Sequence, residues 1–184
     1  MSPGGAAHAA PARTPAAAMR VAIAGARPGD LDAIIALEHR CFTAHDRFAR
    51  ATWRRLLGPS ARAGTSITLV VREGAAVVGT INALLRSTSA AARIYSLAVD
   101  PATQGRGIAR QLVHALMRRL PRRIDAVTLE VREANAAARA LYQRLGMEAS
   151  RRMPGHYPDG GHGLHYTAAR SVVLRASRAS RPRA

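Results

Sequence analysis

The stretch YSLAVDPATQGRGIA, residues 95–109, joins a short apolar strand to a glycine-containing loop that opens a helix. The first N–H groups of a helix have no partners within the helix and form its positive end, so they bind phosphate. Gly105 and Gly107 lack a Cβ, which lets the backbone approach a ligand closely, and Arg106 and Arg110 add positive charge. This stretch therefore predicts a site for a phosphate-bearing ligand.

The simpler interpretation of this loop is a tight turn that uses glycine for its geometry alone. A second segment, VTLEVREANAAARALYQRLGM at residues 127–147, repeats the strand-to-helix design. Together the two segments resemble the GCN5-related N-acetyltransferase (GNAT) superfamily, whose members bind acetyl-coenzyme A (acetyl-CoA). The second segment resembles the RimI-like branch, which comprises ribosomal-protein alanine N-acetyltransferases and relatives that acetylate N-terminal amines. The resemblance covers about residues 19–167 and is dense over residues 95–159.

This resemblance implies an α/β fold, the GNAT fold, with a central mixed, mostly antiparallel sheet of about seven strands flanked by about four helices. The apolar pattern predicts strands near residues 21–26, 67–72, 75–85, 93–99, 126–132, 148–153 and 163–168. Helical spacing predicts helices from Leu31, over 47–57, over 105–120 and over 136–145. The order of these elements is that of the superfamily.

One acetyltransferase domain is expected over residues 19–168, because a chain of 184 residues with 48% hydrophobic content has enough apolar surface for one core. Residues 1–18 are rich in alanine and proline, a composition that cannot bury enough surface to order itself. Residues 169–184 form a basic tail that we also expect to be disordered. The alternative is a tail that holds the protein near ribosomal RNA.

The net charge of +17 would ordinarily indicate a nucleic-acid partner. All 28 basic residues are arginine, however, and the lack of lysine indicates a compositional bias rather than a nucleic-acid surface. Aromatic residues make up only 4% of the chain, too few for the base-stacking surface of single-strand binders. We expect no sequence-specific nucleic-acid partner, while ribosome association stays open.

Neither a membrane span nor a secretory signal is visible, since no stretch approaches ~20 continuous apolar residues. We therefore expect a cytoplasmic protein with no membrane partner. The single cysteine, Cys41, cannot form an internal disulfide, and its apolar neighbours predict a position in the core.

Glu130 is the candidate catalytic base. Side chains alternate along a strand, so Glu130 lies opposite Val127, Leu129 and Val131, on the face expected to look into the acceptor cleft. An amine must be neutral to attack a thioester, and one carboxylate, acting directly or through a water, suffices to take its proton. The resembled branch uses a glutamate at this position as its base. The alternative is a surface glutamate paired with an arginine.

Tyr142 is the candidate catalytic acid. It lies two turns into the helix after Asn135, on a face that can point toward the thioester sulfur. The matching tyrosine of the family is the general acid. With ordinary pKa values, proton transfer from a phenol to a thiolate runs uphill by ~2 kcal/mol, so hydrogen-bond donation is an equal alternative. A helix tyrosine with its hydroxyl at the surface is the interpretation without catalysis.

Binding of acetyl-CoA is expected to involve three parts of the chain. The resemblance assigns the backbone of residues 97–99 to the acetyl carbonyl and pantetheine arm. Asn135 is a natural N-cap that the family also places beside the cofactor. The predicted cofactor-binding residues are Leu97, Ala98, Val99, Gln104, Gly105, Arg106, Gly107, Ile108, Ala109, Arg110, Asn135 and Tyr142.

The acceptor-binding segment, RRMPGHYPDGGHGLHY at residues 151–166, resembles the branch's G-Y-Y-x-D-G-E-D-A pattern only in part. Tyr157 is the candidate for packing over the acceptor N-terminus. His156 replaces the first tyrosine of the pattern, and Gly-His-Gly replaces its acidic stretch. His156, His162 and His165 lie in or near glycine-rich turns and have no cysteine partners, so we predict no metal site.

These observations predict an acetyl-CoA-dependent N-acetyltransferase that acetylates a protein or peptide N-terminal α-amine, such as that of a ribosomal protein, by direct transfer. One alternative is an acetyltransferase for a small amine such as an aminoglycoside or polyamine, which the scarcity of acidic residues disfavours. The other is a non-catalytic acetyl-CoA-sensing or RNA-associated module, which the presence of Glu130 and Tyr142 disfavours. The sequence leaves the oligomeric state and the acceptor open.

Overall fold

The computed structural model describes residues 21–179. The strands of its sheet are β1 (Ile23–Gly25), β2 (Ser66–Glu73), β3 (Ala76–Leu85), β4 (Ala91–Val99), β5 (Ala126–Arg132), β6 (Glu148–Met153) and β7 (Gly163–Ala169). The helices are α1 (Leu31–Cys41), α2 (Arg50–Leu57), α3 (Pro59–Arg62), α4 (Ile108–Arg119), α5 (Ala136–Arg144) and α6 (Arg170–Ala179). In this described range no helix is both long and apolar enough to cross a membrane. The N-terminal segment expected to be disordered, residues 1–18, lies outside it.

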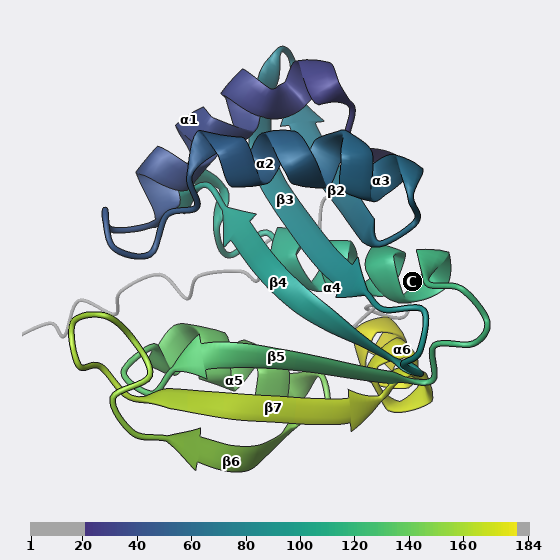
Figure 1. The fold of residues 1–184 in the computed structure, drawn as a ribbon, viewed down its shortest axis with the longest axis vertical. Coiled ribbons are helices and arrows are strands. Elements are labelled where there is room, and N and C mark those ends of the chain that lie inside the picture. Colours follow the sequence, from purple (N-terminus) through teal and green to yellow (C-terminus); the bar gives the residue numbers. More distant parts are fainter. Residues whose placement is uncertain (1–20, 180–184) are drawn as a thin grey trace, which may run out of the picture.

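The seven strands lie in the order β1-β2-β3-β4-β5-β7-β6, and every neighbouring pair except β4 and β5 is antiparallel. This order confirms the predicted α/β class with a mixed, mostly antiparallel sheet. The parallel strands β4 and β5 are joined through α4, the crossover that a parallel pair needs. Figure 1 shows β4 and β5 converging at one end and diverging at the other.

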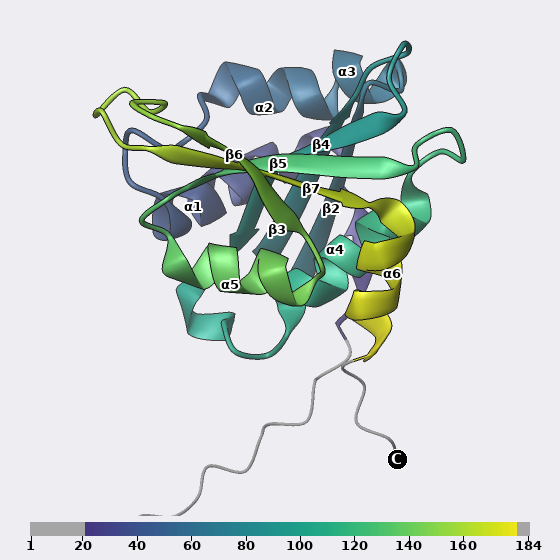
Figure 2. The same cartoon turned by 90° about the horizontal axis from the view of Figure 1, so that it is seen from below.

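Helices cover both faces of the sheet, and each face has its own apolar cluster. Figure 2 shows α1, α2 and α3 on one side and α4, α5 and α6 on the other. The cluster under α1 and α2 includes the fully buried Ile34 and Trp53. The larger cluster includes Leu112 of α4 and Val127 of β5. Helices α1 and α2 contact β2, β3 and β4, so they do not extend over the same face of β5.

Helix α4 lies close to the sheet because β3 carries a glycine beneath it. A Cβ added at Gly79 would lie 3.0 Å from Cγ2 of Ile108 and 3.2 Å from Cδ1 of Leu112. Both of these α4 side chains are buried. The first turn of α4, with the glycine-containing loop before it, is thereby fixed against the sheet beside the end of β4.

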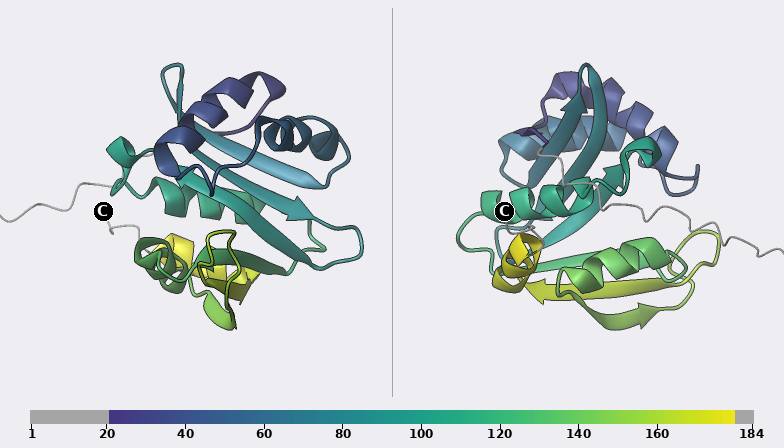
Figure 3. Two further views of the ribbon diagram at one scale, coloured as in Figure 1. Left: turned by 60° about the vertical axis from the view of Figure 1, so that its left-hand side comes forward. Right: turned by 180° about the vertical axis from the view of Figure 1, so that it is seen from behind.

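The C-terminal segment differs from the sequence prediction. A disordered tail over residues 169–184 is wrong for Arg170–Ala179, which form α6. Val173 of this helix is fully buried in the larger apolar cluster, and α6 packs against α4. In Figure 3, right, the yellow α6 lies beside α4. Within the short apolar run VVL at residues 172–174, Val173 is fully buried and its two neighbours are partly buried, whereas the rest of the helix is mostly arginine, serine and alanine. Residues 180–184 lie outside the described range.

Candidate active site

The site is built where β4 leaves β5. The two strands pair over a short stretch that ends at Ile94 opposite Leu129. The register of β4 against β3 shifts between Ile94 and Ser96, which leaves Tyr95 as an extra residue in a bulge. A bulge bends its strand, and beyond Tyr95 β4 turns away from β5 (Figure 1). Backbone groups of this part of β4 that face β5 therefore have no strand partner.

A cavity of about 380 Å³ lies at this divergence. Its walls come from β4, β5, α5, the loop between α1 and α2, and the loop between β6 and β7. Five residues predicted from the sequence line it together: Leu97, Glu130, Asn135, Tyr142 and Tyr157. Residues up to 60 positions apart in the chain thus meet in one cavity.

Glu130 points into this cavity from β5. The alternation of the strand is as predicted, with Val127, Leu129 and Val131 buried on the opposite face. Oε2 of Glu130 accepts a hydrogen bond from Nη2 of Arg93 at 2.7 Å and lies 2.9 Å from Nε2 of His156. Glu130 therefore lies in the cavity, as the catalytic interpretation expects, and it is also paired with an arginine, as the alternative interpretation expects.

Helix α5 brings Asn135 and Tyr142 to the same cavity. Oδ1 of Asn135 accepts the N–H of Ala138 at 3.0 Å, so the predicted N-cap is confirmed. Tyr142 is 7% exposed, and this burial raises the pKa of its phenol. The interpretation of Tyr142 as a surface residue is therefore wrong. A phenol held in its protonated form is suited to donate a hydrogen bond or a proton.

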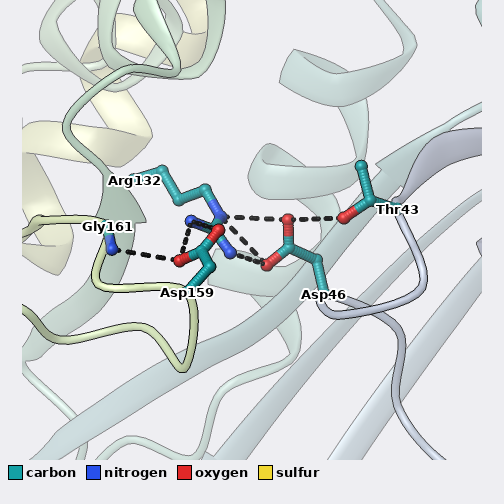
Figure 4. A network of polar contacts seen from close by, with 5 residues as sticks. All are labelled: Thr43, Asp46, Arg132, Asp159 and Gly161. Carbon is teal, nitrogen blue, oxygen red and sulfur yellow. Dashed lines mark hydrogen bonds and ion pairs between the residues drawn. The ribbon is translucent and has the colours of Figure 1, made fainter.

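Arg132 ties together the two loops beside the cavity. Nε of Arg132 donates to Oδ1 and Oδ2 of Asp46, in the loop before α2, at 2.9 and 3.0 Å. Nη1 donates to both carboxylate oxygens of Asp159, in the loop after β6, at 3.0 Å each. Figure 4 shows the guanidinium between the two carboxylates, with the Thr43 hydroxyl donating to Asp46 on one side and the N–H of Gly161 donating to Asp159 on the other. These contacts raise the pKa of Arg132 and keep it charged.

Aromatic residues are concentrated around the cavity. Five of the seven in the chain line it, namely Phe42, Phe48, Tyr95, Tyr142 and Tyr157. The rings of Phe48 and Tyr95 stack with centroids 4.4 Å apart, and the guanidinium of Arg132 lies 4.0 Å from the ring centroid of Tyr157. The predicted acceptor residue Tyr157 is thus held in place by the same arginine that joins the loops.

The glycine-containing loop before α4 has the geometry of an anion site. Gly105 and Gly107 adopt φ values of 80° and 75°, which favour glycine. The first hydrogen bond within α4 runs from the N–H of Gln111 to the carbonyl of Gly107 at 3.1 Å. The N–H groups of residues 108–110 precede it and have no acceptor within the helix. This arrangement fits a pyrophosphate group.

The two arginines of this loop have different surroundings. Nη1 of Arg106 donates to Oε1 of Glu73 at 2.9 Å, so this guanidinium is turned toward the β2–β3 hairpin. Nη1 of Arg110 is buried and has no hydrogen-bond partner among residues 21–179. Such a group is costly unless an anion satisfies it, which indicates that Arg110 is the arginine poised for a phosphate.

Three of the predicted cofactor residues, at the end of β4 and just after it, make contacts within the protein. Ala98 is 2% exposed and packs in the cluster under α1 and α2, on the face away from Leu97. The carbonyl of Val99 accepts hydrogen bonds from Nε2 of Gln104 at 3.1 Å and from Sγ of Cys41 at 3.4 Å. The side chain of Gln104 thus hydrogen-bonds to the last carbonyl of β4.

Several residues of the cavity were missed by the sequence analysis. Arg93, Asp46 and Arg132 carry ordinary charges in unremarkable sequence contexts, and the partner of Arg132 lies 86 positions away. His156 offered one signal, since it stands in place of a tyrosine in the resembled pattern. The other two histidines of that segment bind elsewhere: Nδ1 of His162 accepts the N–H of Gly155, and Nδ1 of His165 contacts Oγ of Ser150.

Comparisons with known proteins agree with this geometry. Residues 31–147 match the family model described as the acetyltransferase (GNAT) family. Over 73 residues the chain is 41% identical to the bS18-alanine N-acetyltransferase of Salmonella typhimurium, a match that covers 39% of this chain and 49% of the relative. The matched stretches span only 36% to 49% of the curated relatives' own lengths.

Solved structures share the fold. The ribosomal-protein-S18-alanine N-acetyltransferase of Escherichia coli superposes with a TM-score of 0.70 at 24% identity, over 82% of this chain and 94% of that one. A chain of the NatC complex bound to Gag peptide and CoA superposes with a TM-score of 0.69 at 20% identity, over 82% and 99%. The family match over most of the chain, joined to this fold, shows that the protein belongs to the GNAT family of acetyltransferases.

Proposed function

We propose that this protein transfers an acetyl group from acetyl-CoA directly to the N-terminal α-amine of a protein. One observation carries the proposal: Glu130 and Tyr142 line a single cavity at the point where β4 and β5 diverge. A proton acceptor and a proton donor thus flank a place where strand backbone is free to hold an acyl chain.

In this proposal Glu130 provides the base and Tyr142 the acid. The acceptor amine must lose a proton to attack, and the Glu130 carboxylate, directly or through a second group, receives it. The buried hydroxyl of Tyr142 donates toward the sulfur that leaves. The backbone at Leu97 is the candidate donor for the acetyl carbonyl.

Acetyl-CoA, when bound, supplies the acetyl group as a thioester. Its pyrophosphate fits the N–H groups at the start of α4, with the unpartnered Nη1 of Arg110 as the cationic contact. Asn135 and Tyr142 line the cavity with Glu130, where the reacting acetyl group belongs. The CoA named with the NatC structure supports a cosubstrate of this type.

The acceptor class rests on the relatives. The curated relatives with about 40% identity include alanine N-acetyltransferases of ribosomal protein bS18, and such an acceptor would place the reaction in the cytoplasm. In the cavity, the aromatic side chains of Phe48, Tyr95 and Tyr157 offer surface for the first residues of a peptide.

The test is release of free CoA thiol from acetyl-CoA in the presence of short peptides that begin with Ala, Ser or Met. Each peptide has a matched control with an acetylated N-terminus. We expect turnover only with free α-amines, ranked by the first residue. Turnover with a polyamine or aminoglycoside but with no peptide would contradict the proposal, as would binding of acetyl-CoA without turnover of any amine.

A further inference from the structure

His156 occupies a position next to the proposed base that no sequence pattern assigned. Its ring lines the cavity, and Nε2 lies 2.9 Å from Oε2 of Glu130. The same oxygen accepts a hydrogen bond from Nη2 of Arg93 at 2.7 Å. One carboxylate oxygen thus serves both a guanidinium and an imidazole.

The contacts of Glu130 determine which nitrogen of His156 carries the proton. A carboxylate bound to a guanidinium is an acceptor, so Nε2 of His156 donates to it and bears hydrogen. In a neutral imidazole the other nitrogen, Nδ1, then has a free lone pair. Nδ1 of His156 has no hydrogen-bond partner among residues 21–179, so that lone pair is available.

The ring of His156 is held in one orientation by its surroundings. It packs edge-on against Tyr157, with centroids 5.0 Å apart at 84°. A Cβ added at Gly163 would lie 3.1 Å from Cδ2 of His156, so the glycine lets the ring pack closely against β7. Because Cδ2 and Nδ1 are on opposite edges of an imidazole, Nδ1 is turned away from Gly163.

We propose that His156 is the group that takes the proton from the acceptor amine, with Glu130 as the residue that positions it. Nδ1 of His156 takes a proton from the ammonium form of the acceptor, and the neutral nitrogen then forms its bond to the acetyl carbon and releases its second proton to solvent as the amide forms. The carbon–sulfur bond breaks, and its electron pair stays on sulfur, which receives the hydroxyl proton or hydrogen bond of Tyr142. Glu130 stabilises the imidazolium that forms, in the manner of base and orienting carboxylate in nucleophilic enzymes.

This inference rests on the proposed function and refines one step of it: the proton assigned there to Glu130 is received by Nδ1 of His156, and Glu130 acts through the imidazole. It also fits the chemistry of the acceptor, because imidazole is the side chain best matched to proton transfer near neutral pH. The guanidinium of Arg93 balances the negative charge of Glu130, and the carboxylate keeps its role of orienting His156.

The test compares His156→Ala and His156→Gln with the wild-type protein on a free-α-amine peptide. We expect kcat to fall by about 10² or more in both variants, the usual contribution of a positioned base. Added imidazole should restore activity to His156→Ala, where it can fill the space of the lost ring. His39→Ala, which changes an exposed histidine on α1, is the matched control and should keep wild-type kcat.

A second acceptor separates proton transfer from a merely structural role. A peptide with an N-terminal hydrazide is already neutral near neutral pH, so the penalty of His156→Gln should shrink at least tenfold with it. A penalty equal for both acceptors and unmoved by imidazole, or variants within about twofold of wild type, would overturn the role of His156. Failure of the proposed function would differ, because the wild-type protein itself would then not acetylate the free-amine peptide.

Discussion

Replacing Tyr142 with phenylalanine removes one hydroxyl group and keeps a ring that is only 7% exposed. If the hydroxyl donates to a sulfur that becomes charged, the change loses a hydrogen bond to a charged group, worth about 1.5–3 kcal/mol. Since each 1.36 kcal/mol is a factor of ten, kcat should fall by about 10- to 160-fold. Burial raises the pKa of this phenol, so the loss should be uniform over the neutral and mildly alkaline range.

The assay is CoA thiol release with both substrates saturating, so that kcat and not binding is compared. Tyr166→Phe is the matched control, because Tyr166 is 1% exposed and its ring centroid lies 6.1 Å from that of Tyr142, yet it does not line the cavity. Its kcat should stay within about twofold of wild type. Full turnover in Tyr142→Phe, or an equal loss in Tyr166→Phe, would refute the acid role.

Three further predictions concern the cofactor loop, α6 and a buried carboxyl. Arg110→Met should weaken CoA binding about tenfold or more in calorimetric titration, because its buried guanidinium is the cationic contact for phosphate. The control Arg106→Met loses a contact to Glu73 instead and should change CoA affinity less than threefold. Equal effects of the two variants would contradict the assignment of Arg110 to the phosphate. Val173→Ala should lower the free energy of unfolding by about 1–3 kcal/mol in denaturant titration, because this α6 side chain is fully buried, and no change would show that α6 does not pack on the core. Burial raises the pKa of Glu38 above its ordinary value of 4.5, so its contribution to stability is fully present below that value and is lost as pH rises. The melting temperature of Glu38→Gln should therefore rise relative to that of the wild type as the pH goes from acidic to neutral. A difference in melting temperature that is the same at every pH would refute this.

Much of the fold was predictable because its local patterns are strong. The bounds of β5 agree with the prediction at both ends, since Val127, Leu129 and Val131 alternate with polar residues. The bounds of β6 agree as well. The start of α4 was less accurate, because the glycines at 105 and 107 adopt a left-handed backbone and delay the helix to Ile108.

Other features depend on contacts that a sequence does not display. The bulge at Tyr95, which bends β4 away from β5, arises from the register against β3 and has no glycine or proline to mark it. Helix α6 was missed because its arginines and serines hide a short apolar run whose partner surface is formed by α4. The bridge from Arg132 to Asp46 and Asp159 joins three segments that only the folded chain brings together.

The central claim is that the cavity at the β4–β5 divergence directs acetyl transfer to an N-terminal α-amine. The most direct measurement is mass spectrometry of a peptide that has both a free N-terminus and one internal lysine, after incubation with the protein and acetyl-CoA. Because this chain contains no lysine, any acetyl-lysine detected must come from the substrate. The account predicts an acetyl group on the α-amine alone, formed more slowly by Tyr142→Phe. Acetylation of the lysine side chain instead, or of neither amine, would contradict it.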